Sequence, residues 1–136
     1  MKSFLQHGQI STYDHCVCVA RMSFLLNRRF ALGADEESMV RGAFLHDFYL
    51  YDWHDCTQRA GRWHGFRHPA IALANAERLY PLNAKERDII RSHMWPLTFL
   101  HWPHSREALL VCLADKICST RETLLCRRVT VRPAGF

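Results

Sequence analysis

Residues 42–54 read GAFLHDFYLYDWH, an apolar helical stretch that leads directly into an adjacent histidine and aspartate, His46 and Asp47. The apolar pattern begins earlier, and Asp35, Glu36 and Glu37 stand where a capping side chain and first-turn acids stabilise a helix. These residues predict a helix that starts after Asp35 and ends at the His-Asp pair or just beyond it.

Two stretches flank this helix in the sequence. Residues 12–29 carry a dense helical pattern of apolar side chains, with Ser11 or Thr12 available as the N-cap. Residues 48–67 lack sustained periodicity, and a loop of this length in a small domain is often functional.

Further helices are expected in the second half of the chain. One should start near His68, because Pro69 suits the first helical position. The next should run from a capping box formed by Asn83 and Glu86 to His93. A last long helix should follow Ser105. Five helices without an alternating strand pattern predict an all-α fold, a bundle of five to six helices.

The length and composition of the chain limit the classes of protein to which it can belong. The chain has 136 residues, a formal charge of +5, 49% hydrophobic and 23% charged residues. These values predict a single domain over residues 1–136, with a core at about 10–125 and a basic tail at 127–136. A chain of this size can bury a core without a structural metal, so any metal is expected to serve chemistry.

Cysteine usage and the N-terminal sequence predict a cytoplasmic protein. There is no CxxC pair among the six cysteines, which we expect to be reduced thiols. The first residues, MKSFLQHGQI, lack the apolar core of a signal peptide, and no window is apolar enough to cross a membrane.

Histidine is the unusual component, with nine in the chain. Each predicted helix carries a histidine or aspartate near one end or inside an apolar face. A lone histidine of this kind is usually a hydrogen-bonded core residue, but burying six such groups without partners would cost roughly 1 to 3 kcal/mol each. A shared centre of divalent ions would satisfy them together, since imidazole and carboxylate suit Fe, Mn, Zn, Co or Ni. The six candidate ligands are His15, His46, Asp47, His68, His93 and Asp115.

This ordered series resembles the HD-domain metal-dependent phosphohydrolases, in particular small stand-alone bacterial members. That family has a histidine in an early helix, an adjacent His-Asp pair, further histidines and an aspartate in a late helix. The resemblance covers about residues 10–125. It implies one ion held by His15, His46, Asp47 and Asp115. It also implies a second ion at His68 and His93, with Asp47 bridging the two and orienting the attacking water.

The resemblance also implies an activity. We expect hydrolysis of a phosphate mono- or diester of a small molecule such as a nucleotide, by a water that a binuclear centre activates. Some HD-domain proteins fill the same ligand set with two irons and activate oxygen, so a di-iron oxygenase is the alternative. A non-catalytic nucleotide-binding module is the second alternative.

Candidate substrate contacts lie close to the ligands in the sequence. His64 and Arg67 precede His68, and Lys116 follows Asp115, so each could contact a substrate phosphate; the alternative for all three is an ordinary surface position. His54 and His104 are expected in loops around the same pocket. The expected partner is a small anionic, phosphate-containing substrate. We do not expect binding to nucleic acid or to a membrane, although the basic tail would allow contact with nucleic acid.

Overall fold

A computed structural model of the chain describes the backbone of residues 5–7, 10–48 and 64–130, and the side chains of 11–48 and 68–124. Two short strands, β1 (Leu5–His7) and β2 (Ile10–Ser11), pair antiparallel before the first helix. Five helices follow: α1 (Thr12–Phe30), α2 (Glu36–Leu45), α3 (His64–Leu79), α4 (Ala84–Ser92) and α5 (Arg106–Thr130). The all-α prediction is confirmed, and the small strand pair is an addition that the sequence pattern did not indicate.

The predicted helix starts are confirmed where a capping side chain marks them. Ser11 caps α1 and Asp35 caps α2, each accepting a hydrogen bond from the third residue of its helix. Asn83 and Glu86 form the reciprocal capping box of α4. At α5, the Ser105 hydroxyl accepts from the backbone N–H of Ala108.

Helix α3 begins earlier than predicted. Its first residue is His64, so Pro69 lies inside the helix and not at its first position. Pro69 is the sixth residue of α3, where proline cannot donate to the carbonyl oxygen of Gly65 and its ring crowds that carbonyl, yet the helix continues through it. The ligand candidate His68 therefore lies in the second turn of α3, where its direction is set by a helix.

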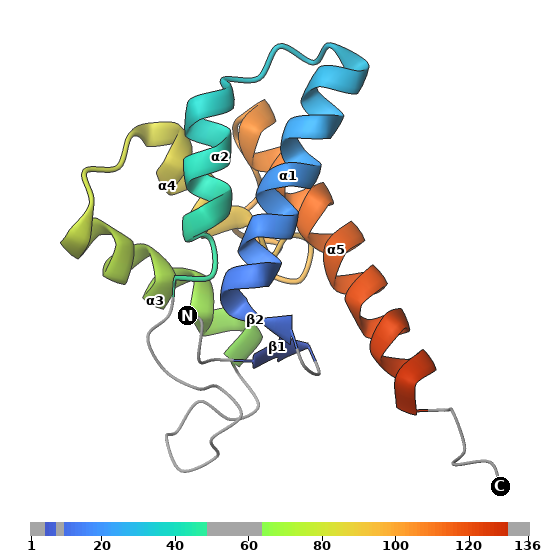
Figure 1. The fold of residues 1–136 in the computed structure, drawn as a ribbon. Helices are drawn as coiled ribbons and strands as arrows, with labels where there is room; N and C mark the ends of the chain where they lie inside the picture. Colours follow the sequence, from blue (N-terminus) through green and yellow to red (C-terminus); the bar gives the residue numbers. More distant parts are fainter. Residues whose placement is uncertain (1–4, 8–9, 49–63, 131–136) are drawn as a thin grey trace, which may run out of the picture.

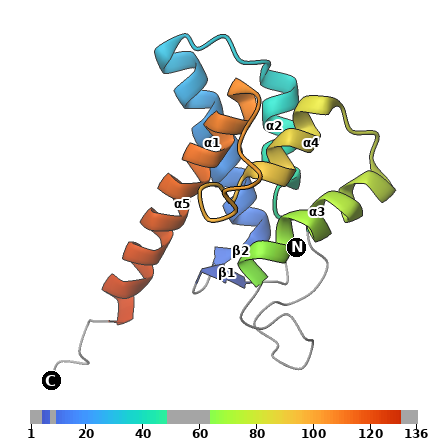
Figure 2. The ribbon, with the colours of Figure 1, turned by 180° about the vertical axis from the view of Figure 1, so that it is seen from behind.

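The helices pack so that α1 contacts α2 and α5, and α4 joins α2, α3 and α5. Figure 1 shows α1, α2 and α5 beside one another, with the C-terminal part of α5 extending past the other helices. Figure 2 shows from behind how the chain between α4 and α5 loops back beside both of them. The main core cluster includes Val19, Met39, Ile89 and Val111, from α1, α2, α4 and α5.

A glycine allows α2 and α4 to approach closely. A Cβ atom at Gly42 would lie 3.0 Å from both Cβ and Cγ2 of Ile89, closer than packed carbon atoms allow. The contact brings the C-terminal ends of α2 and α4 together, and these ends carry His46 and His93 as their C-cap residues. Gly42 thus helps to position two candidate ligands. No described helix is long and apolar enough to span a membrane.

Candidate metal centre

The structure brings all six predicted ligands together in the interior. Their exposed fractions are 7% or less, and three of the four histidines are 1% exposed or fully buried. They come from five helices: His15 from the first turn of α1, His46 and Asp47 from the end of α2, His68 from α3, His93 from the end of α4 and Asp115 from α5. The sequence separates these residues by up to 100 positions, and only the packing of the helices joins them.

One group of possible ligand atoms consists of His15, His46 and Asp47, whose atoms all lie within 4.8 Å of one another. Nε2 of His46 lies 3.6 Å from Oδ2 of Asp47. Asp115 adjoins this group, with Oδ1 at 3.1 Å from Nε2 of His15 and 3.9 Å from Nε2 of His46. This group could hold a metal ion.

A second group consists of Asp47, His68 and His93. Oδ1 of Asp47 lies 3.3 Å from Nε2 of His68 and 3.4 Å from Nε2 of His93. The two imidazole nitrogens are themselves 2.8 Å apart. Asp47 belongs to both groups and turns one oxygen toward each, which is the arrangement of a carboxylate that can bridge two ions.

Backbone carbonyls orient two of the rings. Nδ1 of His46 donates to the carbonyl oxygen of Ala43 over 2.6 Å, and Nδ1 of His93 donates to that of Ile90 over 2.8 Å. A neutral imidazole that donates from Nδ1 keeps its lone pair on Nε2, the nitrogen that faces the centre. These two rings are therefore arranged as metal ligands.

The polar atom that best tests the fit is Nε2 of His46. It is buried and has no hydrogen-bond partner among the described residues. An unsatisfied buried nitrogen costs about 1 to 3 kcal/mol. A divalent cation at the lone pair of this nitrogen would remove that cost, so the donor set fits a metal.

Glu122, on α5, is a functional candidate that the sequence analysis missed. Its Oε2 lies 2.9 Å from Nδ1 of His15, on the side of the ring opposite Asp115, and its side chain is buried. A carboxylate behind a ligating imidazole fixes the ring and raises its basicity. The sequence could have indicated Glu122, because it lies seven residues after Asp115 and both residues therefore share one face of a helix.

The charges of the site favour a cation. Burial lowers the pKa of His15, but hydrogen bonds with the carboxylates of Asp115 and Glu122 outweigh it and raise that pKa to about 10. Burial raises the pKa of Asp47, but the neighbouring imidazoles outweigh it and hold that pKa well below its ordinary value. His46 lacks a comparable partner, and burial lowers its pKa to about 4. Asp47 is therefore ionised and His46 neutral near pH 7, as metal binding requires. The raised pKa keeps His15 protonated, so an ion at Nε2 of His15 would have to displace the proton from that nitrogen.

Of the three predicted substrate contacts, the structure describes the side chain of Lys116. Lys116 lies beside the centre, where its ammonium donates to the carbonyl oxygen of His93 over 2.8 Å and lies 3.5 Å from Oδ2 of Asp115. His64 and Arg67 belong to α3, but their side chains lie outside the described residues, as does all of His54.

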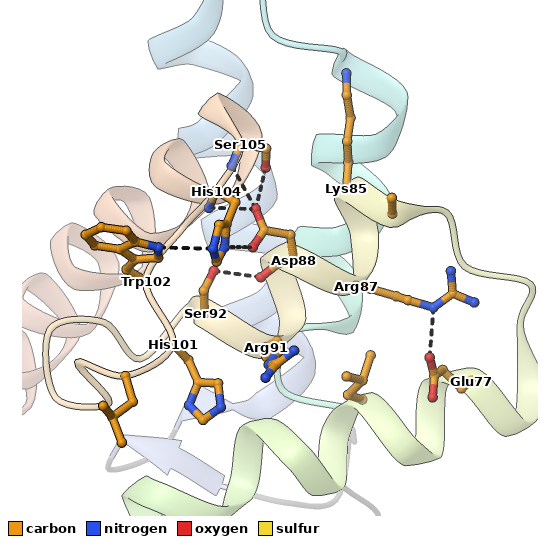
Figure 3. A pocket seen from close by; sticks show the side chains of 13 residues that line it. Glu77, Lys85, Arg87, Asp88, Arg91, Ser92, His101, Trp102, His104 and Ser105 are labelled. Carbon is orange, nitrogen blue, oxygen red and sulfur yellow. Dashed lines mark hydrogen bonds and ion pairs between the residues drawn. The ribbon is translucent and has the colours of Figure 1, made fainter.

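His104 does not rim the metal centre. His104 lies just before α5, where it is hydrogen-bonded to Trp102 and paired with Asp88 of α4. It lines a separate pocket of about 850 Å³ along α3, α4 and the segment before α5, together with Arg91 and His101 (Figure 3). Among the described residues that line this pocket, there is none of the six candidate ligands.

Comparisons with models of protein families, with curated proteins and with solved structures found no match to this chain. Over the residues that the structure describes, the protein is all-α, with five helices and buried His/Asp groups that could hold metal ions.

Proposed function

We propose that this protein is a metal-dependent phosphohydrolase of the HD-domain type, which hydrolyses a phosphate mono- or diester of a small molecule such as a nucleotide. The observation that carries the proposal is the position of Asp47 in two buried groups of possible ligands at once. A carboxylate shared by two groups of ligands can bridge the two ions of a binuclear centre, whereas a structural site is closed around one ion.

The roles of the chain's own residues follow from their contacts. His15, His46 and Asp115 would complete one ion site around Asp47, and His68 and His93 would complete the other. Two divalent ions held there would supply positive charge for the phosphate oxygens and a water of lowered pKa. Asp47 would orient that water, and the Glu122 carboxylate would hold the His15 ring in place.

An anionic substrate is compatible with the residues around the centre. Lys116 is a cationic residue beside the candidate metal centre, and 40% of its side chain is exposed. Its ammonium would draw a phosphate toward the ligand-bearing ends of the helices. Arg67 and His64 on α3 are the further proposed contacts. We propose a small-molecule substrate and no binding to a membrane or to nucleic acid.

The first experiment measures the metal content of protein purified without a chelator. Elemental analysis should give close to two transition-metal ions per chain, one for each His/Asp group. Protein that binds no transition metal, even after incubation with Mn, Fe, Co, Ni or Zn, would overturn the proposal.

The second experiment measures phosphate release from nucleotides and phosphosugars under anaerobic conditions with Mn or Co. Turnover without oxygen is the expected result, and a chelator should abolish it. Oxygen consumption with a mixed-valent iron signal would identify an oxygenase and overturn the proposal. Saturable nucleotide binding by the metal-loaded protein without any turnover would indicate the non-catalytic module.

A further inference from the structure

The sulfur atoms of Cys18 and Cys118 lie 3.1 Å apart. The two residues are 100 positions apart in the sequence, on the neighbouring helices α1 and α5. A disulfide requires a sulfur separation of about 2.05 Å, so an approach of about 1 Å would allow a bond between them. The sequence has no CxxC motif, so this pair is a product of helix packing.

The two thiols differ in their surroundings. Cys18 is partly exposed, whereas Cys118 is fully buried. Burial also raises the pKa of the Cys118 thiol. Cys18 is therefore the sulfur that a dissolved oxidant can reach, while Cys118 stays a protonated thiol. Its reaction with an oxidised Cys18 depends on the 3.1 Å between the two sulfurs.

The remaining described cysteines lack this arrangement. The Cys112 thiol donates to the carbonyl oxygen of Trp95 over 3.0 Å. The sulfur of Cys16 lies 4.0 Å from Nδ1 of His46 and is fully buried. Among the described residues, the pair of Cys18 and Cys118 is the one place where two sulfurs meet.

We propose that Cys18 and Cys118 form a reversible disulfide when the protein meets a hydroperoxide. The Cys18 thiolate attacks one peroxide oxygen, the O–O bond breaks, and Cys18 becomes a sulfenic acid while water or an alcohol leaves. The Cys118 sulfur then attacks the Cys18 sulfur, the S–O bond breaks, and the hydroxyl leaves as water with the Cys118 thiol proton. The two thiols supply the two electrons that reduce one peroxide, and a dithiol reductant reverses the bond by exchange.

The bond would join α1 to α5 beside the candidate metal centre. Cys18 lies three residues after His15 on α1, and Cys118 lies between Asp115 and Glu122 on α5. These are the helices on which His15 meets its two carboxylate partners. The disulfide itself requires only the packing of α1 on α5, and it does not depend on the proposed phosphohydrolase activity.

Peptide mapping of the folded, full-length protein tests the proposal. Reduced protein is treated with hydrogen peroxide under native conditions, its remaining thiols are alkylated, and the digest is analysed by mass spectrometry. We expect a peptide that links Cys18 to Cys118 and weighs two hydrogen atoms less than its two parts, with Cys112 recovered in alkylated form. Dithiothreitol should return both cysteines to the free form.

Two cysteine variants and the products of oxidation test the proposal further. Cys112→Ser should retain the cross-link, and Cys18→Ser should lose it. Recovery of both Cys18 and Cys118 as alkylated thiols after oxidation would overturn the proposal, as would a stable sulfinic acid at Cys18 or a bond from Cys18 to another cysteine. Because the mapping uses the wild-type protein, these outcomes remain decisive even where a variant fails to fold.

Discussion

Nδ1 of His15 lies 2.9 Å from Oε2 of Glu122, while Nε2 of the same ring lies 3.1 Å from Asp115. The imidazole is therefore held at both nitrogens by carboxylates of α5, and one of these is a candidate ligand. Removal of the outer carboxylate should weaken metal binding without removing a ligand.

Glu122→Gln should lower metal affinity by about 10-fold to 100-fold, the usual effect of losing a carboxylate behind a ligating histidine. The amide keeps the size of the side chain but not its charge. Competition with a chromogenic chelator measures the affinity. Glu77→Gln is the matched control, because Glu77 pairs with Arg87 at the surface and should leave affinity unchanged. Equal affinity in Glu122→Gln and wild type would argue against this role.

Asp47→Asn should remove most of both ions and abolish turnover, because a neutral amide cannot bridge two cations. The effect should exceed that of Glu122→Gln, since Asp47 belongs to both groups of possible ligands. Elemental analysis and phosphate release measure it, and circular dichroism checks that the helices persist. Asp35→Asn is the control, because asparagine caps a helix as well as aspartate. Unchanged metal content in Asp47→Asn would show that Asp47 is not a shared ligand.

His68→Ala should reduce the metal content from close to two ions to close to one. The variant loses a donor of the second group, while His15, His46 and Asp47 remain intact. Elemental analysis after dialysis against metal-free buffer measures the ratio. The complementary variant, His15→Ala, should deplete the other ion. Loss of both ions from either variant would show that the two groups bind metal as one unit.

Glu107 makes stability depend on pH. Burial raises the pKa of Glu107, but hydrogen bonds from the backbone N–H of Asp35 and from Lys85 outweigh it and lower that pKa in the folded state. A lowered folded-state pKa stabilises the protein above the unfolded-state pKa of roughly 4.3, and the stabilisation is lost as pH falls through the folded-state pKa.

Glu107→Gln should therefore lower the free energy of unfolding at pH 7, and the difference from wild type should shrink as the pH falls below the ordinary glutamate range. Urea denaturation at a series of pH values measures it. Glu37→Gln, at an exposed position of α2, should change little at any pH. If the difference in the free energy of unfolding between wild type and Glu107→Gln stayed constant down to acidic pH, a charge effect at Glu107 would be excluded.

Gly42→Val should destabilise the fold by about 1 to 3 kcal/mol, because the added carbons would overlap Ile89. Chemical denaturation measures the loss. The cost should be smaller when the same change is made in an Ile89→Ala background, where the opposing branches are gone. The same cost in both backgrounds would mean that the close approach of α2 and α4 is not its cause.

The helices themselves could be predicted from local sequence. Asp35, Asn83 with Glu86, and Ser105 mark helix starts because capping depends on residues within one turn of each other. The start of α3 was predicted wrongly, because Pro69 suits a first helical position but lies inside α3, where proline is ordinarily unfavourable. Local sequence also supplied the six candidate ligands, since histidines and aspartates recur on otherwise apolar helix faces.

The sequence by itself therefore determined the fold class and the residue types available for metal chemistry. Only the tertiary structure decided that Asp47 is shared by two groups, that Glu122 stands behind His15, and that Cys18 meets Cys118. The physical reason is distance along the chain. Caps and helical periodicity act within a few residues, whereas contacts between residues far apart in the sequence, such as His15 with Glu122 or Gly42 with Ile89, depend on how whole helices pack.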